Sequence, residues 1–336
     1  MPMNPSDSAR TILVTGGAGF VGSHACKALA AAGYRPVVYD NLSRGHREAV
    51  KWGPLIEGDI LDRNRLEQVI REVQPVAVMH FAAFAYVGES MANPSLYFEN
   101  NVVGTTRLLE AMRATGVTTL VFSSSCAVYG GVHDQPIDES TPCDPSSFYG
   151  QSKLNCEQLI RGFVRHHGFS AIALRYFNAA GSDPDGEIGE DHDPEPHIIP
   201  VVLRVAAGID DKVTLNGADH PTADGTCVRD FVHVCDLAHA HKLAVARALQ
   251  QKMTFEAVNL GVGNGFSLNQ IVEAARRVTG RTIPVTYTDR RPGDPPYAVG
   301  RADYARTALG WTPKFTELDD AIAHSWRWMQ RQAITA

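Results

Sequence analysis

The stretch Thr15-Gly-Gly-Ala-Gly-Phe-Val-Gly22 decides the fold, because it stands between an apolar run and a helical pattern. The run Thr11–Thr15 predicts a buried strand, and Val21–Ala32 predicts a helix. Glycine allows a tight turn between the two and lets backbone N–H groups at the helix N-terminus approach a pyrophosphate. A glycine-rich turn without a ligand is the alternative, and the position between strand and helix argues against it.

Short apolar runs and helical patterns continue to alternate along the first half of the chain. Several of the apolar runs are continuous, as expected for strands covered on both faces. This order predicts an α/β fold with a Rossmann-type, doubly wound parallel sheet. Further strands are expected at Pro36–Asp40, Pro54–Glu57, Val76–Phe81, Thr119–Ser124 and Ser170–Tyr176, and further helices at Arg63–Val73, Leu96–Thr115 and Tyr149–His167.

The composition changes after Phe177. Residues 180–200 are rich in Gly, Asp, Pro and His, which predicts a long loop of the kind that is often functional. We therefore expect a dinucleotide-binding domain over residues 1–176 plus roughly 231–260, and a smaller C-terminal α/β substrate domain over roughly 177–230 plus 261–336. Its shorter elements are expected near Val201–Ala207, Val213–Leu215, Phe231–Leu249, Ala257–Leu260, Leu268–Thr279, Val285–Thr288 and after Glu317.

The charge and composition exclude several classes of partner. A net charge of −6 over 336 residues provides no basic field for nucleic acid or an anionic membrane. The first ten residues lack the apolar stretch of a signal peptide, and no run of 18 apolar residues could span a membrane. The six cysteines form no C-x-x-C pair, so we expect reduced thiols and a cytoplasmic protein. Among the 13 histidines, His233, His239 and His241 are the closest group and share no helix face, so no metal is expected.

Several predicted strands end in residues that suit a dinucleotide. Asp40 stands 18 residues past Gly22 and can accept hydrogen bonds from the hydroxyls of an adenine ribose. Its charge would repel a 2′-phosphate, which favours NAD over NADP, although Arg44 lies close behind. Gly58-Asp-Ile60 and Phe81-Ala-Ala83 follow the next two strands, where they could reach the adenine or let the backbone approach the cofactor. Ordinary turns are the alternative for both.

The segment Tyr149-Gly-Gln-Ser-Lys153 places a tyrosine and a lysine one helical turn apart on one face. A neighbouring ammonium stabilises a tyrosinate, so we expect Lys153 to lower the pKa of Tyr149 and make it a usable base for a sugar hydroxyl. Such pairs also arise by chance. Here Ser123-Ser-Ser125 ends the preceding strand, at the edge where doubly wound sheets bind ligands, and a serine there can bond both a substrate oxygen and Tyr149.

Taken in order, these motifs resemble the extended short-chain dehydrogenase/reductase family, and within it the UDP-sugar 4-epimerases. The resemblance extends from Thr11 to about Trp328. Its other motifs are Tyr39-Asp-Asn-Leu42, Glu57-Gly-Asp-Ile60, Val87-Gly-Glu-Ser90, Asn100-Asn-Val102, Val128-Tyr-Gly130, Arg175-Tyr-Phe-Asn178, Gly189-Glu-Asp191, Asp224-Gly-Thr226, Val228-Arg-Asp-Phe-Val-His-Val234 and Arg291-Pro-Gly-Asp294.

The resemblance implies an NAD-dependent interconversion of UDP-glucose and UDP-galactose through a 4-keto intermediate. Tyr149 would take the O4 proton while the C4 hydride passes to NAD, Lys153 would bind the nicotinamide ribose, and Ser125 would assist the proton transfer. NAD would be regenerated in each turnover. The implied cofactor contacts are Gly16, Gly19, Phe20, Val21, Gly22, Asp40, Asn41, Asp59, Ile60, Phe81, Ala82, Ala83, Asn100, Ser123, Tyr149, Lys153 and Phe177.

A UDP-sugar site in the second half of the chain is implied as well. Arg229 and Arg291 match arginines that contact the pyrophosphate, for which a guanidinium is well suited. The family also implies a homodimer through the helices of Leu96–Thr115 and Tyr149–His167. The implied substrate contacts are Ser125, Tyr149, Asn178, His197, Ile198, Thr214, Asn216, Arg229, Arg291, Asp294 and Ala298.

Three positions distinguish this chemistry from that of related enzymes. Related dehydratases carry Asp-Glu, and related decarboxylases Glu, just after the strand serine, where this chain has Cys126 and Ala127. Ala298 is small where some members carry tyrosine, which should leave room for the N-acetyl group of UDP-GlcNAc and UDP-GalNAc. The alternatives are a UDP-pentose 4-epimerase and a non-catalytic NAD-binding redox sensor, and the intact serine, tyrosine and lysine set argues against the sensor.

Overall fold

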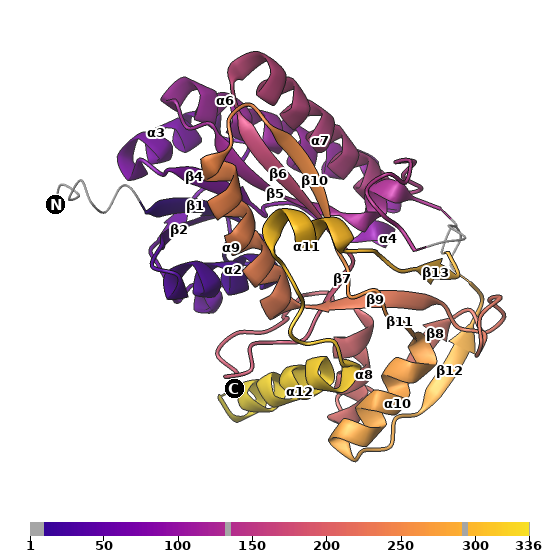
Figure 1. Cartoon of the computed structure of the whole chain (residues 1–336). Coiled ribbons are helices and arrows are strands. Elements are labelled where there is room, and N and C mark those ends of the chain that lie inside the picture. The colour runs from indigo at the N-terminus through magenta and orange to yellow at the C-terminus, as the bar shows by residue number, and fades with distance from the viewer. Residues whose placement is uncertain (1–9, 132–135, 291–294, 336) are drawn as a thin grey trace.

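Seven parallel strands form the large sheet of the molecule (Figure 1). The computed structural model describes residues 10–131, 136–290 and 295–335. The strand order is β10-β6-β5-β4-β1-β2-β3, so the winding reverses beside β1 and the carboxyl ends of all seven strands share one edge. The strands are Thr11–Thr15 (β1), Arg35–Asp40 (β2), Leu55–Glu57 (β3), Ala77–His80 (β4), Thr119–Ser125 (β5), Ser170–Tyr176 (β6) and Phe255–Leu260 (β10).

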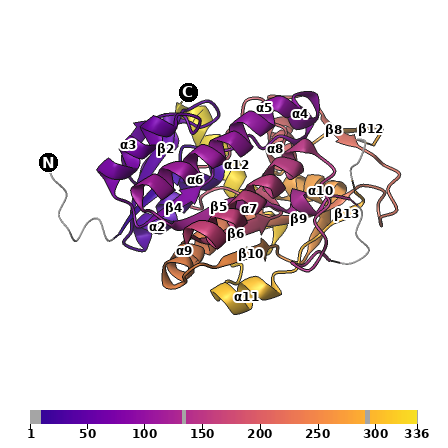
Figure 2. The ribbon, with the colours of Figure 1, turned by 90° about the horizontal axis from the view of Figure 1, so that it is seen from above.

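Helices cover both faces of this sheet (Figure 2). Leu29 of α2 and Leu237 of α9 join one apolar core, whereas Leu66 of α3 and Ile160 of α7 join the core on the other face. The predicted doubly wound sheet is confirmed. No helix in the described part of the chain is long and apolar enough to cross a membrane. The covering helices are Phe20–Ala31 (α2), Arg63–Val73 (α3), Gly104–Thr115 (α6), Phe148–His167 (α7) and Val234–Gln250 (α9).

A smaller α/β unit lies below the large sheet in Figure 1. In it β9 pairs with β7, β11 and β13, and β8 pairs with β12. Val202, Ile271 and Ile322 belong to its own apolar core. The strands of this unit are Asn178–Ala180 (β7), Val213–Asn216 (β8), Val228–His233 (β9), Gly265–Ser267 (β11), Val285–Thr288 (β12) and Tyr297–Ala298 (β13), and its helices are Ile198–Ala206 (α8), Leu268–Thr279 (α10) and Leu318–Thr335 (α12).

The chain passes between the large and the small unit at residues that differ from the domain limits expected from the sequence. Residues 231–233 were expected with the dinucleotide domain, but they end β9, which pairs within the small sheet. The large unit therefore resumes with α9. Near the other end, α11 (Asp303–Leu309) packs against β10 and α9, and Ala305 and Trp311 join the core of the large sheet.

The single helix expected over Leu96–Thr115 is divided into three parts. The chain forms α5 (Pro94–Tyr97), a π-helical turn over Phe98–Val103 (η2), and then α6. A π-helical turn carries one extra residue and is frequent at functional sites. The short elements η1 (Arg47–Ala49), α4 (Val87–Ala92) and η3 (Cys126–Tyr129) were not expected, because runs of three to six residues carry no clear periodicity.

We expect Gly22→Ala to destabilise the chain by about 1–3 kcal/mol or more, because a Cβ there would lie 2.2 Å from the Gly16 carbonyl oxygen. The control is Gly162→Ala in the middle of α7, where a Cβ would meet no atom within 4 Å. That change should be neutral or stabilise the helix by up to about 1 kcal/mol. Urea unfolding of both variants measures the difference, and equal effects would contradict the close approach.

Candidate functional site

The glycine turn after β1 touches the loop after β4. Gly16 has a φ of +74°, and a Cβ there would lie 2.4 Å from the backbone nitrogen of Ala82. Gly19 is the N-cap of α2 and offers no side-chain cap, so no side chain bonds the first N–H groups of the helix. Phe20 and Val21 supply these groups. An uncapped helix N-terminus beneath a close-packed glycine turn fits a pyrophosphate.

The Asp40 carboxylate is held rigidly beside this turn. It accepts hydrogen bonds from the backbone N–H groups of Ala18, at 3.0 Å, and Leu42, at 2.9 Å. Burial raises the pKa of Asp40, and these two bonds act against that shift. Next to it Asn41 donates to the Asp59 carboxylate at 2.9 Å. This arrangement presents carboxylates at the ends of β2 and β3, where an adenine ribose is expected.

Arg44 was the one residue that argued for NADP over NAD, because it could bind a 2′-phosphate. In the structure its guanidinium has other partners. Its guanidinium pairs with Glu89 at 2.7 Å and lies over the rings of Tyr86, at 5.0 Å, and Phe84, at 5.3 Å. These contacts tie the loop after β2 to the loop after β4. The guanidinium is thus already neutralised by a carboxylate, and this favours NAD.

The other expected cofactor residues also follow the carboxyl ends of the strands. Phe81 and Ala82 both donate backbone hydrogen bonds to the Thr15 carbonyl, which continues the pairing of β4 with β1. Ile60 is buried against Gly104 of α6. Ala83 and Phe177 follow β4 and β6, and Asn100 lies in η2.

Lys153 is buried at the end of β5. Its ammonium donates to the Ser123 carbonyl at 2.7 Å and lies 5.0 Å from the Phe122 ring centroid and 5.9 Å from that of Tyr149. The tyrosine is nearly buried as well, with 9% of its surface exposed. The structure thus brings the expected tyrosine and lysine together at the carboxyl edge of the sheet.

The pKa of Tyr149 is shifted upward, opposite to the direction expected from its neighbour Lys153. Burial raises the pKa of Tyr149, because a buried phenolate loses its hydration, and the Ser125 hydroxyl acts only partly against this. Burial also lowers the pKa of Lys153 to about 8. The ammonium is directed at the Ser123 carbonyl, so its charge stabilises that oxygen first.

The three serines at the end of β5 have separate partners. The Ser123 hydroxyl shares a 2.6 Å hydrogen bond with the Tyr176 hydroxyl. Ser124 donates to Glu157 at 2.6 Å. The Ser125 hydroxyl accepts from the Ala127 N–H at 3.1 Å, and the residue is buried, so it is fixed near Tyr149 at the start of η3.

Sequence reasoning missed a buried ionic network beneath the serines. Glu157 receives two hydrogen bonds from Arg175, at 2.9 and 2.5 Å, and Arg175 also donates to the Tyr129 hydroxyl at 2.9 Å. Tyr129 in turn donates to Asn259 of β10 at 2.6 Å. The spacing of Glu157, four residues after Lys153 on α7, was the signal that could have revealed it.

Asn101 was also missed, although its motif was noted. It lies in the π-helical turn η2, where its side-chain oxygen accepts from the Phe84 N–H at 2.9 Å. Its amide group donates to the Phe84 carbonyl and to Ser152 of α7, both at 3.0 Å. This one buried side chain therefore fixes the loop after β4 to the helix that carries Tyr149. Direct side-chain contacts of this kind cannot be read from helical spacing.

The expected substrate residues line strands of the small unit. Arg229 on β9 stands beside Ala298 on β13 in the strand register. Asn178 on β7 donates to the Asp230 carbonyl at 2.9 Å. Thr214 and Asn216 on β8 bond the side chains of β12, and His197 and Ile198 begin α8. Arg291 and Asp294 lie outside the described residues.

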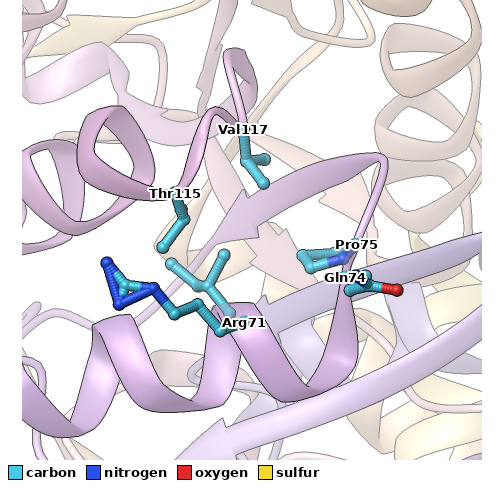
Figure 3. Close-up of a pocket in the computed structure, with 6 residues that line it drawn as sticks. Arg71, Gln74, Pro75, Thr115 and Val117 are labelled. Atoms are coloured by element: carbon cyan, nitrogen blue, oxygen red, sulfur yellow. The ribbon is translucent and has the colours of Figure 1, made fainter.

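A surface hollow of about 300 Å³ lies away from this site (Figure 3). It is lined by Arg71 and Gln74 at the end of α3, by Thr115 at the end of α6, and by Val117 just beyond it. These residues precede β4 and β5, so the hollow lies at the amino ends of the strands. No expected site residue lines it.

The chain belongs to the NAD dependent epimerase/dehydratase family, which matches residues 12–261. This confirms the resemblance inferred from the motifs. The class of protein that the fold and the site define is therefore a Rossmann-type enzyme that binds a dinucleotide on its large sheet.

Particular relatives narrow the class to 4-epimerases. The chain is 46% identical to the UDP-glucose 4-epimerase of Rhizobium meliloti (strain 1021) over 321 residues, covering 96% of this chain and 97% of that one. Its structure is similar to the UDP-glucose 4-epimerase of Brucella ovis in complex with NAD, with a TM-score of 0.92, 48% identity, and 95% and 98% coverage. It is also similar to the UDP-Glc/GlcNAc 4-epimerase of Campylobacter jejuni, with a TM-score of 0.82, 34% identity, and 96% and 99% coverage.

We expect the buried Lys153 to make the cofactor-free chain more stable as pH rises through the alkaline range. Because the folded pKa is about 8 and the ordinary value is 10.5, the unfolded chain binds more protons between these values. The cost of burying the ammonium is thus fully present below pH 8 and is lost as the pH rises toward 10.5. The free energy of unfolding should gain up to about 1.4 kcal/mol per pH unit in this window, relative to Lys153→Met.

Denaturant unfolding of both proteins at several pH values isolates this contribution, because the other titrating groups are common to the two. A difference that stays flat from pH 7.5 to 10.5 would show that Lys153 keeps its ordinary pKa.

Proposed function

We propose that this chain is an NAD-dependent 4-epimerase that interconverts UDP-glucose and UDP-galactose. The observation that carries the proposal is the grouping of Ser125, Tyr149 and Lys153 at the carboxyl edge of the sheet, beside the glycine turn. A base next to a dinucleotide site suits the oxidation of an alcohol. The base removes the hydroxyl proton while the carbon passes a hydride to the dinucleotide. The identity to UDP-glucose 4-epimerases over almost the full chain supports the same reaction.

Tyr149 is the proposed base for the O4 proton of the sugar. Burial raises its pKa in the cofactor-free chain, so it holds its proton until a positive charge arrives. NAD, when bound, supplies the acceptor and donor of the C4 hydride and brings the positive nicotinamide. Once Tyr149 has released its own proton to solvent, it would take the proton from O4 and later return it, while Ser125 would hold the sugar oxygen and Lys153 would orient the ribose hydroxyls.

Inversion at C4 requires the keto sugar to present its opposite face while the uridine diphosphate stays bound. The small unit offers residues for this on strands that are separate from the large sheet. Arg229 and Asn178 are the proposed contacts of the diphosphate, together with Arg291. Thr214 and Asn216 of β8, with Asp294, are the proposed contacts of the uridine side.

The positions after Ser125 favour epimerisation over loss of water. Cys126 packs against the core of the large sheet, and burial raises its pKa to about 12, so it remains a neutral thiol. Ala127 contributes only a methyl group and a backbone N–H. With neither an acid nor a base at these two positions, Tyr149 is the proposed acid and base that acts on the sugar.

The proposal extends to a homodimer. Leu96 on α5 and Phe148 on α7 are large apolar side chains with 42% and 40% of their surface exposed. They stand at the starts of the helical stretches expected to form the dimer.

The six cysteines carry no disulfide, which fits a reducing cytoplasm.

Purified protein incubated separately with UDP-glucose, UDP-GlcNAc and UDP-xylose tests the reaction, with products resolved by chromatography. We expect conversion of UDP-glucose to UDP-galactose without added NAD. Because Ala298, which pairs with Arg229 in the strand register, has a small side chain, UDP-GlcNAc should be converted as well. No conversion of any sugar, even with NAD supplied, would remove the proposal and favour the redox sensor, and conversion of UDP-xylose alone would favour a pentose epimerase.

Ala298→Tyr tests the proposed wall of the sugar pocket. The larger side chain should lower kcat/KM for UDP-GlcNAc by about 10-fold to 100-fold, whereas the activity on UDP-glucose should change little. Equal losses on both sugars would show that residue 298 does not discriminate between them.

We expect Tyr149→Phe to lower kcat for UDP-glucose by about 10²-fold to 10⁴-fold, because a positioned base contributes a factor of this size. The NAD content and the unfolding temperature should stay close to those of the parent chain. Tyr304→Phe on α11, where the ring is exposed, is the matched control and should retain full activity. Retained activity in Tyr149→Phe would assign the base to another group.

A further inference from the structure

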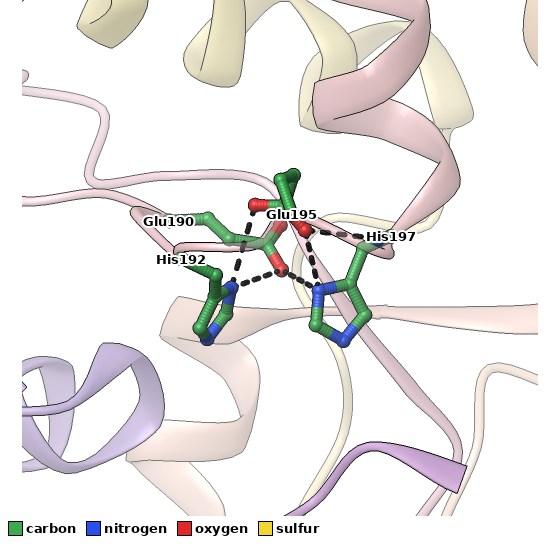
Figure 4. A group of neighbouring side chains, drawn as sticks. All are labelled: Glu190, His192, Glu195 and His197. Atoms are coloured by element: carbon green, nitrogen blue, oxygen red, sulfur yellow. Dashed lines mark hydrogen bonds and ion pairs between the residues drawn. The ribbon is translucent and has the colours of Figure 1, made fainter. Parts of the chain in front are cut away.

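Four side chains in the connection between β7 and α8 form a compact group of metal-ligating atoms, here named the His–Glu cluster (Figure 4). It consists of Glu190, His192, Glu195 and His197, whose ligand atoms all lie within 4.8 Å of one another. Figure 4 shows contacts from both imidazoles to both carboxylates. Since these residues are separated by irregular loop, neither helix nor strand periodicity indicated that they meet.

The spacing of these atoms is close to that of ligands around a small divalent cation, and the closest pair, His197 Nδ1 and Glu195 Oε1, shares a hydrogen bond. His192 Nδ1 lies 3.4 Å from Glu190 Oε1 and 3.4 Å from Glu195 Oε2. His197 Nδ1 lies 2.9 Å from Glu190 Oε1 and 2.7 Å from Glu195 Oε1. Ligands at 2.0–2.1 Å from a metal stand about 3.4 Å apart in a tetrahedron and about 3 Å apart in an octahedron.

Burial makes the two carboxylates depend on a compensating positive charge, which either protonated imidazoles or a metal ion can supply. The exposed fraction is 4% for the Glu190 side chain and 10% for that of Glu195. His192 Nδ1 is itself buried and makes no hydrogen bond, although both carboxylates lie 3.4 Å from it. A buried donor or acceptor without a partner is costly, and buried carboxylates require compensation.

We propose that the His–Glu cluster binds one divalent cation of the zinc class through Nδ1 of both histidines and one oxygen of each glutamate. Two imidazole nitrogens and two carboxylate oxygens are a donor set that suits Zn²⁺, and four protein ligands make the site structural. A single divalent charge balances the two carboxylates and gives His192 Nδ1 its partner. This inference does not depend on the proposed function.

Another acidic group in the same connection shows how the fold satisfies carboxylates elsewhere. Asp183, Asp185 and Glu187 surround the Lys27 ammonium at 2.8, 3.1 and 2.6 Å. That group already contains its cation, supplied by α2. In the His–Glu cluster the carboxylates face imidazoles, which can either carry protons or bind a metal.

The proposed metal would fix the connection against the cofactor side of the molecule. The His192 ring contacts Phe20 of α2, with centroids 6.2 Å apart, and Tyr86, at 5.9 Å. The His197 ring also contacts Tyr86, at 6.1 Å. A metal on Nδ1 of His197 leaves the proton on Nε2 and sets the ring orientation at the start of α8.

Zinc titration of the chain, without an affinity tag and after removal of metals, tests the proposal. Burial would lower the pKa of His192 and His197, but the carboxylates raise these values to about 9 and about 10, so protons compete with zinc and binding should be tighter at pH 8 than at pH 7. We expect one Zn²⁺ per chain, measured by competition with a chromophoric chelator. Zinc should also raise the unfolding temperature.

His192→Gln and Glu195→Gln should each weaken zinc binding by about 100-fold or more, because each removes one ligand. His239→Gln, at an exposed histidine of α9, is the matched control and should bind as the parent chain does. Circular dichroism checks that each variant is folded. If one variant unfolds, the other variant and the cobalt spectrum decide.

Replacement of zinc by Co²⁺ identifies the ligands independently of activity. Visible d–d bands without sulfur-to-metal charge transfer are expected for nitrogen and oxygen ligands. Unchanged zinc affinity in both variants, or a thiolate charge-transfer band, would overturn the proposal. The cluster would then hold only two histidinium–carboxylate pairs.

Discussion

The bond from the buried Lys153 ammonium to the Ser123 carbonyl is the interaction on which the site depends. It joins the second turn of α7 to the end of β5, so the helix that carries Tyr149 is held at the carboxyl edge of the sheet. The ammonium can be buried there because the Ser123 carbonyl oxygen accepts its hydrogen bond at 2.7 Å. Burial still disfavours the charged form of Lys153, and this lowers the pKa of the lysine to about 8.

Two further buried contacts stabilise the same helix. One turn beyond Lys153, Glu157 binds Ser124 and Arg175, which ties α7 to β5 and β6. On the other side, Asn101 links Ser152 to the loop after β4. Because each contact involves a buried polar group, loss of any partner would leave another group unpaired. The site is therefore rigid around Tyr149 and Ser125, as acid–base chemistry on a small hydroxyl requires.

The division of labour between the two units follows from their packing. The large sheet presents the glycine turn, Asp40 and the three serines along one edge, and the small unit has its own core. α11 returns from the small unit to pack on β10, and Lys27 of α2 binds the acidic group after β7. These contacts connect the units beside the site, so the proposed sugar and nucleotide contacts are held at a defined place relative to the cofactor edge.

Much of the fold and of the site could be predicted from the sequence, because the signals are local. Continuous apolar runs indicated Thr11–Thr15 and Ser170–Tyr176 with their observed limits, and the glycine spacing indicated the turn. The proximity of Tyr149 and Lys153 was predicted from their spacing of one helical turn. The sequence by itself determined these features since each depends on neighbours along the chain. Only the tertiary structure decided the direction of the Tyr149 pKa shift, the Glu157–Arg175 network and the His–Glu cluster, because burial and contacts between distant or irregular segments exist only after the chain has packed.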